Sequence, residues 1–232
     1  MKKIFGIIAS LCLLVGCVSN RPTILVPDPS ESFSFVANDH LEFSLNVVGI
    51  ETTYDVDTKG NTGSYLSGVV IKNTEKYSYI LTAYHGIDEL KDHKDYTITA
   101  KDQVSEKLSG CSIFYGNEKK DIALLKTKRL DVPEVKRLTE PYPKMLDELF
   151  QVGSPKNIQL YINKVYLVKY YKLEDDIWFK FNGSIRAGNS GGGVFTKDGS
   201  FLGMTLEMED NVNGRGVTAY SIFKEIDKLK YE

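Results

Sequence analysis

The sequence predicts an all-β protein, on two observations about its segments. Roughly a dozen short segments rich in β-branched and aromatic residues alternate with turn residues along most of the chain. Neither long helical periods nor a strand–helix–strand rhythm is present, which argues against a doubly wound parallel sheet. Of the 232 residues, 42% are hydrophobic and the net charge is only −2, so a sizeable core is expected and nucleic acid is not an expected partner.

The first half of the chain carries the clearest strand signals. Residues 65–71 and 77–83 flank the turn residues 73–76, which predicts a β-hairpin. Further strands are expected at 43–50, 96–100, 111–115 and 122–125, with a turn at 59–63.

The second half of the chain has the same alternation of short strand-like segments and turn residues. A charged segment with three prolines, residues 128–144, separates it from the first half and is the best candidate for a linker. An Asp-Gly pair within 197–200 predicts a tight hairpin turn. Strands are expected at 149–153, 160–168, 177–181, 193–195, 201–206 and 216–219.

Only the C-terminus has a helical pattern. Ile222, Phe223, Ile226 and Leu229 recur at helical spacing, with charged residues on the opposite face. The sequence therefore predicts one helix at about residues 220–231, after barrels or sandwiches of antiparallel strands.

The first 16 residues have the pattern of an export signal. Lys2 and Lys3 precede the apolar run Ile4–Val15, which is too short to span a bilayer comfortably. Together with Cys17, this segment resembles the lipobox of bacterial lipoproteins. That resemblance implies cleavage after Gly16 and lipid on Cys17; a plain secretory signal is the alternative.

Residues 17–40 then read as a lipidated tether, because they are rich in Ser, Pro, Asn and Asp without a sustained period. Val18 rather than Asp follows Cys17. By the sorting pattern of enteric lipoproteins, this indicates a bacterial cell envelope location on the periplasmic side of the outer membrane, if the host is Gram-negative. Of the three cysteines, only Cys111 would remain in the folded part, where an alternating segment predicts a small buried hydrophobe.

Three short motifs carry the candidate chemistry. Ser190 stands between glycines in the segment Gly188–Gly192, so a nucleophilic hydroxyl could lie beside backbone donors for a developing oxyanion. His85 ends one apolar strand and Asp121 begins another. A serine hydroxyl needs a base, and the base needs a carboxylate to fix its tautomer. Of the three histidines, His40 lies in the tether and His93 in a solvated charge cluster, which leaves His85 as the base.

These residues appear in the order His, Asp, Ser, and the chain resembles the trypsin-like (chymotrypsin-fold) serine proteases. It is most similar to the bacterial HtrA/Deg branch. The resemblance rests on Thr82–His85, Asp121–Leu125 and Gly188–Gly192, and covers roughly residues 41–231. Smaller similarities lie at 67–70, 152–155 and 214–219.

The resemblance implies a protease domain at 41–232, built of two six-stranded antiparallel β-barrels at about 41–135 and 145–220. It also implies that Ser190 attacks the scissile carbonyl and that His85 moves the proton. Asp121 would orient His85, and the N–H groups of Gly188 and Ser190 would form the oxyanion hole.

Substrate contacts follow from the same resemblance. Leu206, Glu207 and Met208 match the strand that pairs with the substrate backbone. Ser184 matches the base of the specificity pocket and is uncharged, so a small or apolar side chain is expected before the cleaved bond rather than Lys or Arg.

Two departures from the family pattern have consequences. Asn189 replaces the acid that pairs with a newly freed N-terminus in digestive members, which indicates that no such activation step operates. Leu206 replaces a hydroxyl residue that helps to hold the catalytic acid, so Asp121 should find backbone N–H partners around Ala83–His85. The chain has no room for PDZ domains, so regulation by them is not expected.

The resulting hypothesis is a serine-type endopeptidase, a hydrolase that cuts envelope proteins and is anchored by lipid on Cys17, with no metal or cofactor. The alternative is a catalytically silent binding module of the same fold. An esterase with the same triad is a third reading. A fluorophosphonate probe separates the first two, and protein digestion separates protease from esterase.

Overall fold

The computed structural model describes residues 42–232 apart from 57–59, 104, 156–159, 184 and 210–211. The expected signal segment, Cys17, His40 and the tether lie outside the described residues. Within the described part, no helix is long and apolar enough to cross a membrane.

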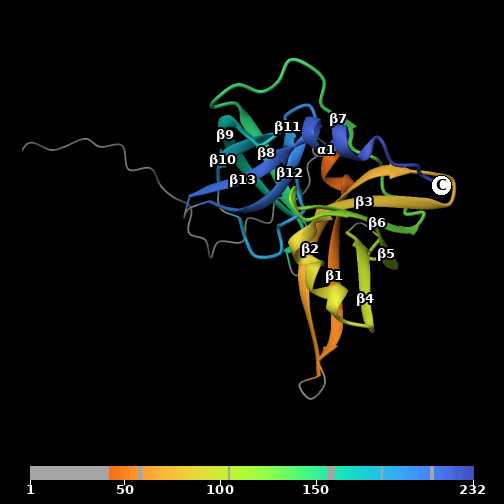
Figure 1. Ribbon diagram of the computed structural model, residues 1–232. Helices are drawn as coiled ribbons and strands as arrows, with labels where there is room; N and C mark the ends of the chain where they lie inside the picture. Colours follow the sequence, from red (N-terminus) through yellow and green to blue (C-terminus); the bar gives the residue numbers. More distant parts are fainter. Residues whose placement is uncertain (1–41, 57–59, 104, 156–159, 184, 210–211) are drawn as a thin grey trace, which may run out of the picture. The chain divides into compact units, whose positions relative to one another are not determined.

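The first six long strands form a closed antiparallel barrel (Figure 1), in the order β1-β2-β3-β6-β5-β4. β4 closes the ring by pairing with β1, with Tyr54 opposite Tyr96 and Val48 opposite Asp102. The strands are β1 (Val47–Val56), β2 (Gly60–Asn73), β3 (Tyr77–Ala83), β4 (Tyr96–Asp102), β5 (Leu108–Asn117) and β6 (Ile122–Lys128).

The second set of strands also closes. Its order is β11-β8-β9-β10-β13-β12, and the pairing of β11 with β12 completes the ring. The strands are β8 (Glu148–Gly153), β9 (Tyr161–Leu173), β10 (Asp176–Asn182), β11 (Gly193–Thr196), β12 (Ser200–Met208) and β13 (Asn213–Thr218). The prediction of two six-stranded antiparallel barrels followed by a helix is confirmed.

Both faces of β3 and β6 are buried, which explains their unbroken apolar runs. Ile80 and Leu125 point into the first barrel, whereas their neighbours Leu81 and Leu124 belong to a second cluster that also contains Val152 of the second barrel. Successive side chains of a strand point to opposite faces, so one face fills the barrel and the other packs against its partner. The residues that follow β3 and precede β6 are therefore brought to the junction of the two barrels.

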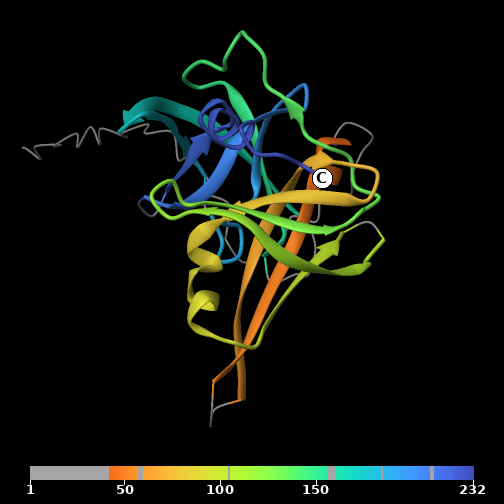
Figure 2. The ribbon, with the colours of Figure 1, turned by 45° about the vertical axis from the view of Figure 1, so that its right-hand side comes forward.

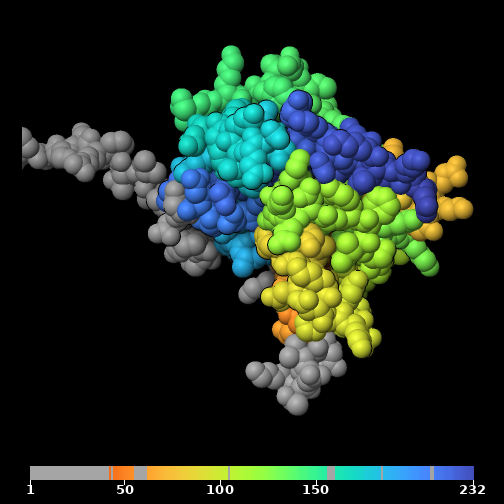
Figure 3. Space-filling view, viewed as in Figure 1, coloured from red at the N-terminus to blue at the C-terminus, as the bar shows by residue number. Residues whose placement is uncertain are grey.

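The C-terminal helix α1 (Ala219–Ile226) packs on this junction. Thr218 caps it by accepting a hydrogen bond from the Ser221 N–H, and Ile222 and Ile226 are fully buried. Beyond the helix, Tyr231 packs edge-on against Tyr79 of the first barrel. The C-terminal residues accordingly lie against first-barrel strands in the space-filling view (Figure 3).

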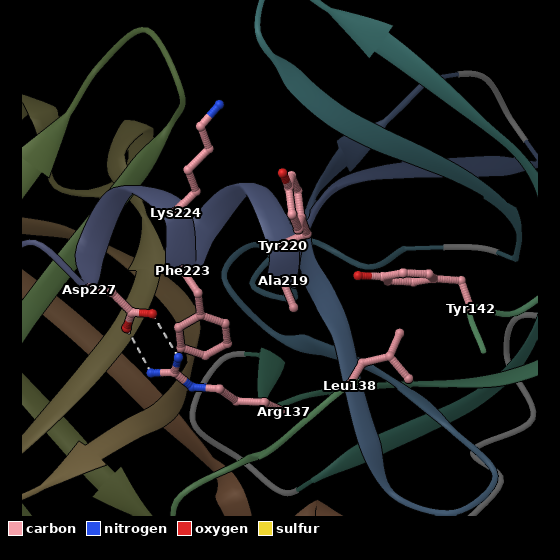
Figure 4. Close-up of a pocket in the computed structure, with 8 residues that line it drawn as sticks. All are labelled: Arg137, Leu138, Tyr142, Ala219, Tyr220, Phe223, Lys224 and Asp227. Atoms are coloured by element: carbon pink, nitrogen blue, oxygen red, sulfur yellow. Dashed lines mark hydrogen bonds and ion pairs between the residues drawn. The ribbon is translucent and has the colours of Figure 1, made fainter. Parts of the chain in front are cut away.

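The connection between the barrels is anchored to the same helix. A two-residue strand, β7 (Lys136–Arg137), pairs in parallel with β12. Arg137 makes two hydrogen bonds of 2.8 Å to Asp227 and stacks on Phe223 (Figure 4). A hollow of about 380 Å³ lies here, and its lining contains none of the predicted catalytic residues.

Several local predictions were wrong. Residues 60–63, expected in a turn, belong to β2 and pair with 53–56 of β1. The expectation that only the end is helical misses three short 3-10 turns, η1 (Glu42–Asn46), η2 (Tyr84–Gly86) and η3 (Asp88–Asp92). The terminal α-helix stops at Ile226 rather than near 231.

His93 and Cys111 also differ from expectation. His93 is not simply solvated, because its ring stacks on Tyr54 at 4.1 Å, where η3 lies beside the β1–β2 hairpin (Figure 2). Cys111 is only partly buried, and it is a free thiol. Burial still raises the pKa of the Cys111 thiol to about 11, which keeps it protonated and unreactive near neutral pH.

Candidate active site

His85 and Asp121 meet where β3 ends and β6 begins. His85 lies in η2, directly after β3, and its Nδ1 is 2.7 Å from Oδ2 of Asp121. The other carboxylate oxygen, Oδ1, accepts a 2.7 Å hydrogen bond from the backbone N–H of His85. The two bonds fix both the position and the ring orientation of the histidine. The structure thus gives Asp121 the kind of backbone partner that the sequence analysis expected.

Asp121 itself has a left-handed backbone conformation, with φ of +53°. This region is costly for most L-residues and is tolerated best by Asn and Asp. The backbone N–H of Tyr84 donates to the Asp121 carbonyl at 3.3 Å. The carboxylate is therefore held by its surroundings in a conformation that an isolated chain would seldom adopt.

The carboxylate also changes the acidity of the imidazole. The hydrogen bond that the His85 ring donates to the Asp121 carboxylate raises the pKa of His85 above its ordinary value, and this outweighs burial, which lowers it. With Nδ1 occupied by Asp121, the remaining ring nitrogen, Nε2, is the one available to exchange a proton with a substrate or a nucleophile.

The glycine loop before Ser190 forms a well-defined turn. The N–H of Asn189 donates to the carbonyl of Arg186 at 2.9 Å, and Gly188 at the third position has φ of +94°. This combination is typical of a type II turn, which requires glycine at that position. In such a turn the N–H of Gly188 points outward, away from the turn's own hydrogen bond.

Most neighbouring backbone donors are paired, and two are not. The N–H groups of Asn189, Gly191 and Gly192 donate to backbone carbonyls at 2.8–2.9 Å. Those of Gly188 and Ser190 donate to no residue of the described part of the chain. Two unpaired donors in the same short loop are what stabilisation of an oxyanion requires.

The hydroxyl of Ser190 is directed toward β12. Its Oγ donates a 2.8 Å hydrogen bond to the carbonyl of Leu206. Among the described residues, no hydrogen bond joins Ser190 to His85, although both line the same pocket. A serine hydroxyl has one proton, so bonding to His85 requires rotation away from Leu206.

One pocket of about 410 Å³ collects nearly all the predicted site residues. Its lining comprises His85, Asp121, Ile185, Arg186, Ala187, Ser190, Leu206, Glu207 and Met208. Gly188 is not among the lining residues and lies in the adjoining turn, and Ser184 lies outside the described residues. Sequence reasoning missed Ile185, Arg186 and Ala187, although their place directly before the glycine loop was a usable signal.

The pocket wall is apolar at one end and ion-paired at the other. A Cβ placed on Gly214 would lie 2.4 Å from Cδ1 of Ile185 and 2.6 Å from the Phe181 ring, so these two side chains fill the space beside Gly214. Glu207 pairs with Arg215, which also lies over the Trp178 ring. The Glu207 charge is therefore largely offset within the protein.

Behind the loop, Asn189 is fully buried, and neither polar atom of its side chain has a partner among the described residues. In the same part of the chain, no group of three His, Cys, Asp or Glu side chains is arranged to hold a metal ion.

Comparison with protein families identifies the architecture. Residues 66–204, more than half of the chain, match the model of the trypsin-like peptidase domain. This chain belongs to the trypsin-like peptidase family. It is accordingly a serine-type endopeptidase of the hydrolase class. A search of curated protein sequences gave no significant match.

Among the solved structures with a similar fold are two bacterial proteases. A serine endoprotease from Yersinia pestis superimposes with a TM-score of 0.67 at 20% identity, covering 83% of this chain and 67% of that one. The Rv3671c protease from M. tuberculosis is also similar. Its active form gives a TM-score of 0.66 at 17% identity and covers 82% of this chain and 83% of that one. Its inactive form gives 0.63 at 16%, with coverages of 82% and 91%. At such identities the likeness concerns the fold.

Proposed function

We propose that this trypsin-like peptidase cleaves proteins of a bacterial envelope with Ser190 as nucleophile, His85 as base and Asp121 as orienting acid. The observation that carries the proposal is the 2.7 Å His85–Asp121 pair in the same pocket as Ser190, beside two unpaired N–H groups. A merely structural turn has no need of that combination.

The reaction follows from these positions. Ser190 Oγ attacks the carbonyl carbon of the scissile peptide bond while Nε2 of His85 takes the hydroxyl proton. The N–H groups of Gly188 and Ser190 donate to the resulting oxyanion. The C–N bond then breaks, and His85 gives its proton to the departing amine. A water molecule, deprotonated by His85, hydrolyses the acyl-enzyme.

Substrate binding would also prepare the nucleophile. A substrate that pairs with Leu206–Met208 presents a backbone N–H to the carbonyl of Leu206, which is the present acceptor of the Ser190 hydroxyl. Competition for this carbonyl releases the hydroxyl to rotate toward His85. In the absence of substrate, the Ser190 hydroxyl is bonded to Leu206 rather than to His85. This observation favours the alternative, a catalytically silent binding module.

The pocket shape favours a small apolar side chain before the cleaved bond. Ile185 and Phe181 fill the space beside Gly214, and no unpaired charge among the described pocket residues would attract Lys or Arg. The N-terminal lipobox-like pattern supports anchoring through Cys17 in the envelope, and the motif pattern supports the HtrA/Deg branch.

The decisive experiment is labelling with a fluorophosphonate probe. Full-length protein in detergent should be labelled, and Ser190→Ala should not. Labelling that persists in Ser190→Ala, or is absent from the unmutated protein, contradicts the proposed nucleophile and favours the silent module. Digestion of casein, compared with hydrolysis of simple esters, then separates a protease from an esterase.

The anchor is tested separately. Cells fed a radiolabelled fatty acid should label the wild-type protein in the membrane fraction but not Cys17→Ala, which should be recovered unlabelled. Equal labelling of the two proteins would contradict lipidation at Cys17.

A further inference from the structure

Ser67 of β2 makes an unusual number of hydrogen bonds around the glycine loop. Its side chain is fully buried, and its Oγ donates to the carbonyl of Gly188 at 2.7 Å. Its backbone N–H donates to the carbonyl of Ser190 at 2.9 Å. The same Oγ accepts from the N–H of Ser154, and its carbonyl accepts from Oγ1 of Thr82. One residue of the first barrel thus binds the loop on both sides of Asn189.

The bond to Gly188 fixes the orientation of a peptide plane. A peptide unit is planar, so a carbonyl directed at Ser67 sends the N–H of Asn189 in the opposite direction. That N–H is the donor that closes the turn onto Arg186 at 2.9 Å. The turn closed by this bond holds the preceding peptide unit, which carries the Gly188 N–H, with Gly188 at φ of +94° and its N–H outward.

Loss of the Ser67 hydroxyl would remove the hydrogen bond that fixes this peptide plane. The Gly188 carbonyl and the Ser154 N–H would each lose a partner of 2.7 Å in a buried place, and an unpaired buried polar group costs about 1–3 kcal/mol. The Gly188 carbonyl could recover a partner by rotating toward water. Such a rotation breaks the turn and changes the direction of the donor proposed for the oxyanion.

The surroundings leave Ser67 little freedom to move. A Cβ placed on Gly191, whose φ is +87°, would lie only 2.1 Å from the Ser67 carbonyl oxygen and 2.5 Å from Oγ1 of Thr82. Ser154 directly follows β8 of the second barrel, and Thr82 lies three residues before His85. The histidine strand, the second barrel and the nucleophile loop therefore meet at this serine.

We propose that Ser67 is a positioning residue, whose hydroxyl holds the Gly188 carbonyl so that the N–H groups of Gly188 and Ser190 face the reacting carbonyl. This role rests on the proposed function of Ser190. Ser67 touches neither substrate nor reacting atoms; it acts through the geometry of the oxyanion donors.

The test compares Ser67→Ala with Ser78→Ala in the full-length protein. Ser78 is a matched control, because its buried hydroxyl also makes two hydrogen bonds, donating to Asn73 and accepting from Leu130, and it does not line the active-site pocket. Ser67→Ala should lower kcat for a peptide substrate about 10- to 100-fold, with KM changed less than about threefold. Direct removal of an oxyanion donor costs about 10²–10³-fold, which sets the upper limit.

Two further measurements separate positioning from a loss of folding. A peptide boronate, whose adduct mimics the tetrahedral intermediate, should bind Ser67→Ala more weakly by the factor lost in kcat. Ser67→Thr, which keeps the hydroxyl, should restore kcat to within about fivefold of wild type. Thermal unfolding should show similar destabilisation of Ser67→Ala and Ser78→Ala.

The outcomes distinguish the two proposals. If fluorophosphonate labels wild type, and Ser67→Ala keeps the kcat and boronate affinity of Ser78→Ala, the positioning role is wrong while the catalytic proposal stands. If wild type itself is not labelled, the catalytic proposal fails first. Should Ser67→Ala not fold, Ser67→Cys, a weak donor, is measured in its place and should show an intermediate loss of kcat.

Discussion

Two of the polar contacts that the first barrel makes with the rest of the chain differ in chemistry. At the Ser67 contact, neutral hydroxyl and backbone groups bind the loop of Gly188 and Ser190, and two loop N–H groups stay unpaired. At the Lys120 contact, an ammonium group bridges carboxylates of Asp176 and Glu225, each at 3.2 Å.

The pairing in the second contact is more complete. Glu225 also accepts a 2.5 Å hydrogen bond from the Tyr115 hydroxyl and a weaker one from the Asn117 amide. The Tyr115 bond, assisted by Lys120, lowers the pKa of Glu225 below its ordinary value. A contact that serves only stability can satisfy its polar groups, whereas a reactive site must leave some donors free. Substitutions on the two sides of this division should therefore differ in whether they lower activity or stability.

Asp121→Asn should cause the largest loss. The amide can no longer hold the tautomer and charge of His85, and kcat/KM should fall about 10⁴-fold. Since Asp121 raises the pKa of His85, the wild-type acidic limb should lie above the ordinary histidine value, and the variant's limb should shift to lower pH. A pH profile of kcat/KM measures both effects. An unshifted limb would show that another group titrates there.

The same pair has a linked effect on folding. A histidine whose pKa is raised in the folded state contributes stability that is fully present below the unfolded pKa. That contribution is lost as pH rises through the folded pKa. The free energy of unfolding of wild type, measured by chemical denaturation, should therefore decline more across this pH window than that of Asp121→Asn.

Lys120→Met should reduce stability rather than catalysis. It leaves the largely buried carboxylates of Asp176 and Glu225 without their cation, at a cost of about 2–3 kcal/mol. Urea denaturation should show the loss, while kcat of the folded enzyme should stay within about threefold. Lys91→Met, which removes an exposed pair with Asp88, is the control and should change stability far less, because solvent screens an exposed pair. A larger effect on kcat than on stability would give the Lys120 contact a catalytic role.

Ile185→Ala should change specificity by about one order of magnitude. Removing the side chain that fills the space beside Gly214 enlarges the pocket, and a methylene-sized change is worth about 1–3 kcal/mol in discrimination. The ratio of kcat/KM for a substrate with Leu before the cleaved bond to one with Ala should rise about tenfold. The exposed Ile177→Ala serves as the control. An unchanged ratio would place the specificity pocket elsewhere.

Arg137→Ala should have the smallest effect. Its pair with Asp227 is half-exposed, and its stacking on Phe223 adds only modestly, so stability should fall by about 1 kcal/mol or less. Calorimetry measures the shift in Tm, and peptide hydrolysis should be unchanged. A loss of hydrolysis would connect the hollow in Figure 4 to the active site.

The fold class and the candidate triad can be predicted from local sequence patterns. Alternating and continuous apolar runs mark strands locally, and His85, Asp121 and Ser190 stand in motifs whose residue types and order carry their own information. The strands at 77–83 and 122–125 are predicted because these segments are rich in β-branched, aromatic and other apolar residues. Residues 60–63 have the composition of a turn but form part of β2, because their pairing with β1 outweighs the local preference.

The contacts that hold the loop of Ser190 are formed only in the folded chain and could not be predicted from the sequence. Ser67 lies 121 residues before Gly188 and bears no local sign of its hydrogen bond to it. The bond from Ser190 to the carbonyl of Leu206 likewise joins residues 16 positions apart, and no residue preference predicts it. Residue types can suggest a nucleophile, but the direction of a peptide plane depends on partners that the fold brings from distant parts of the chain.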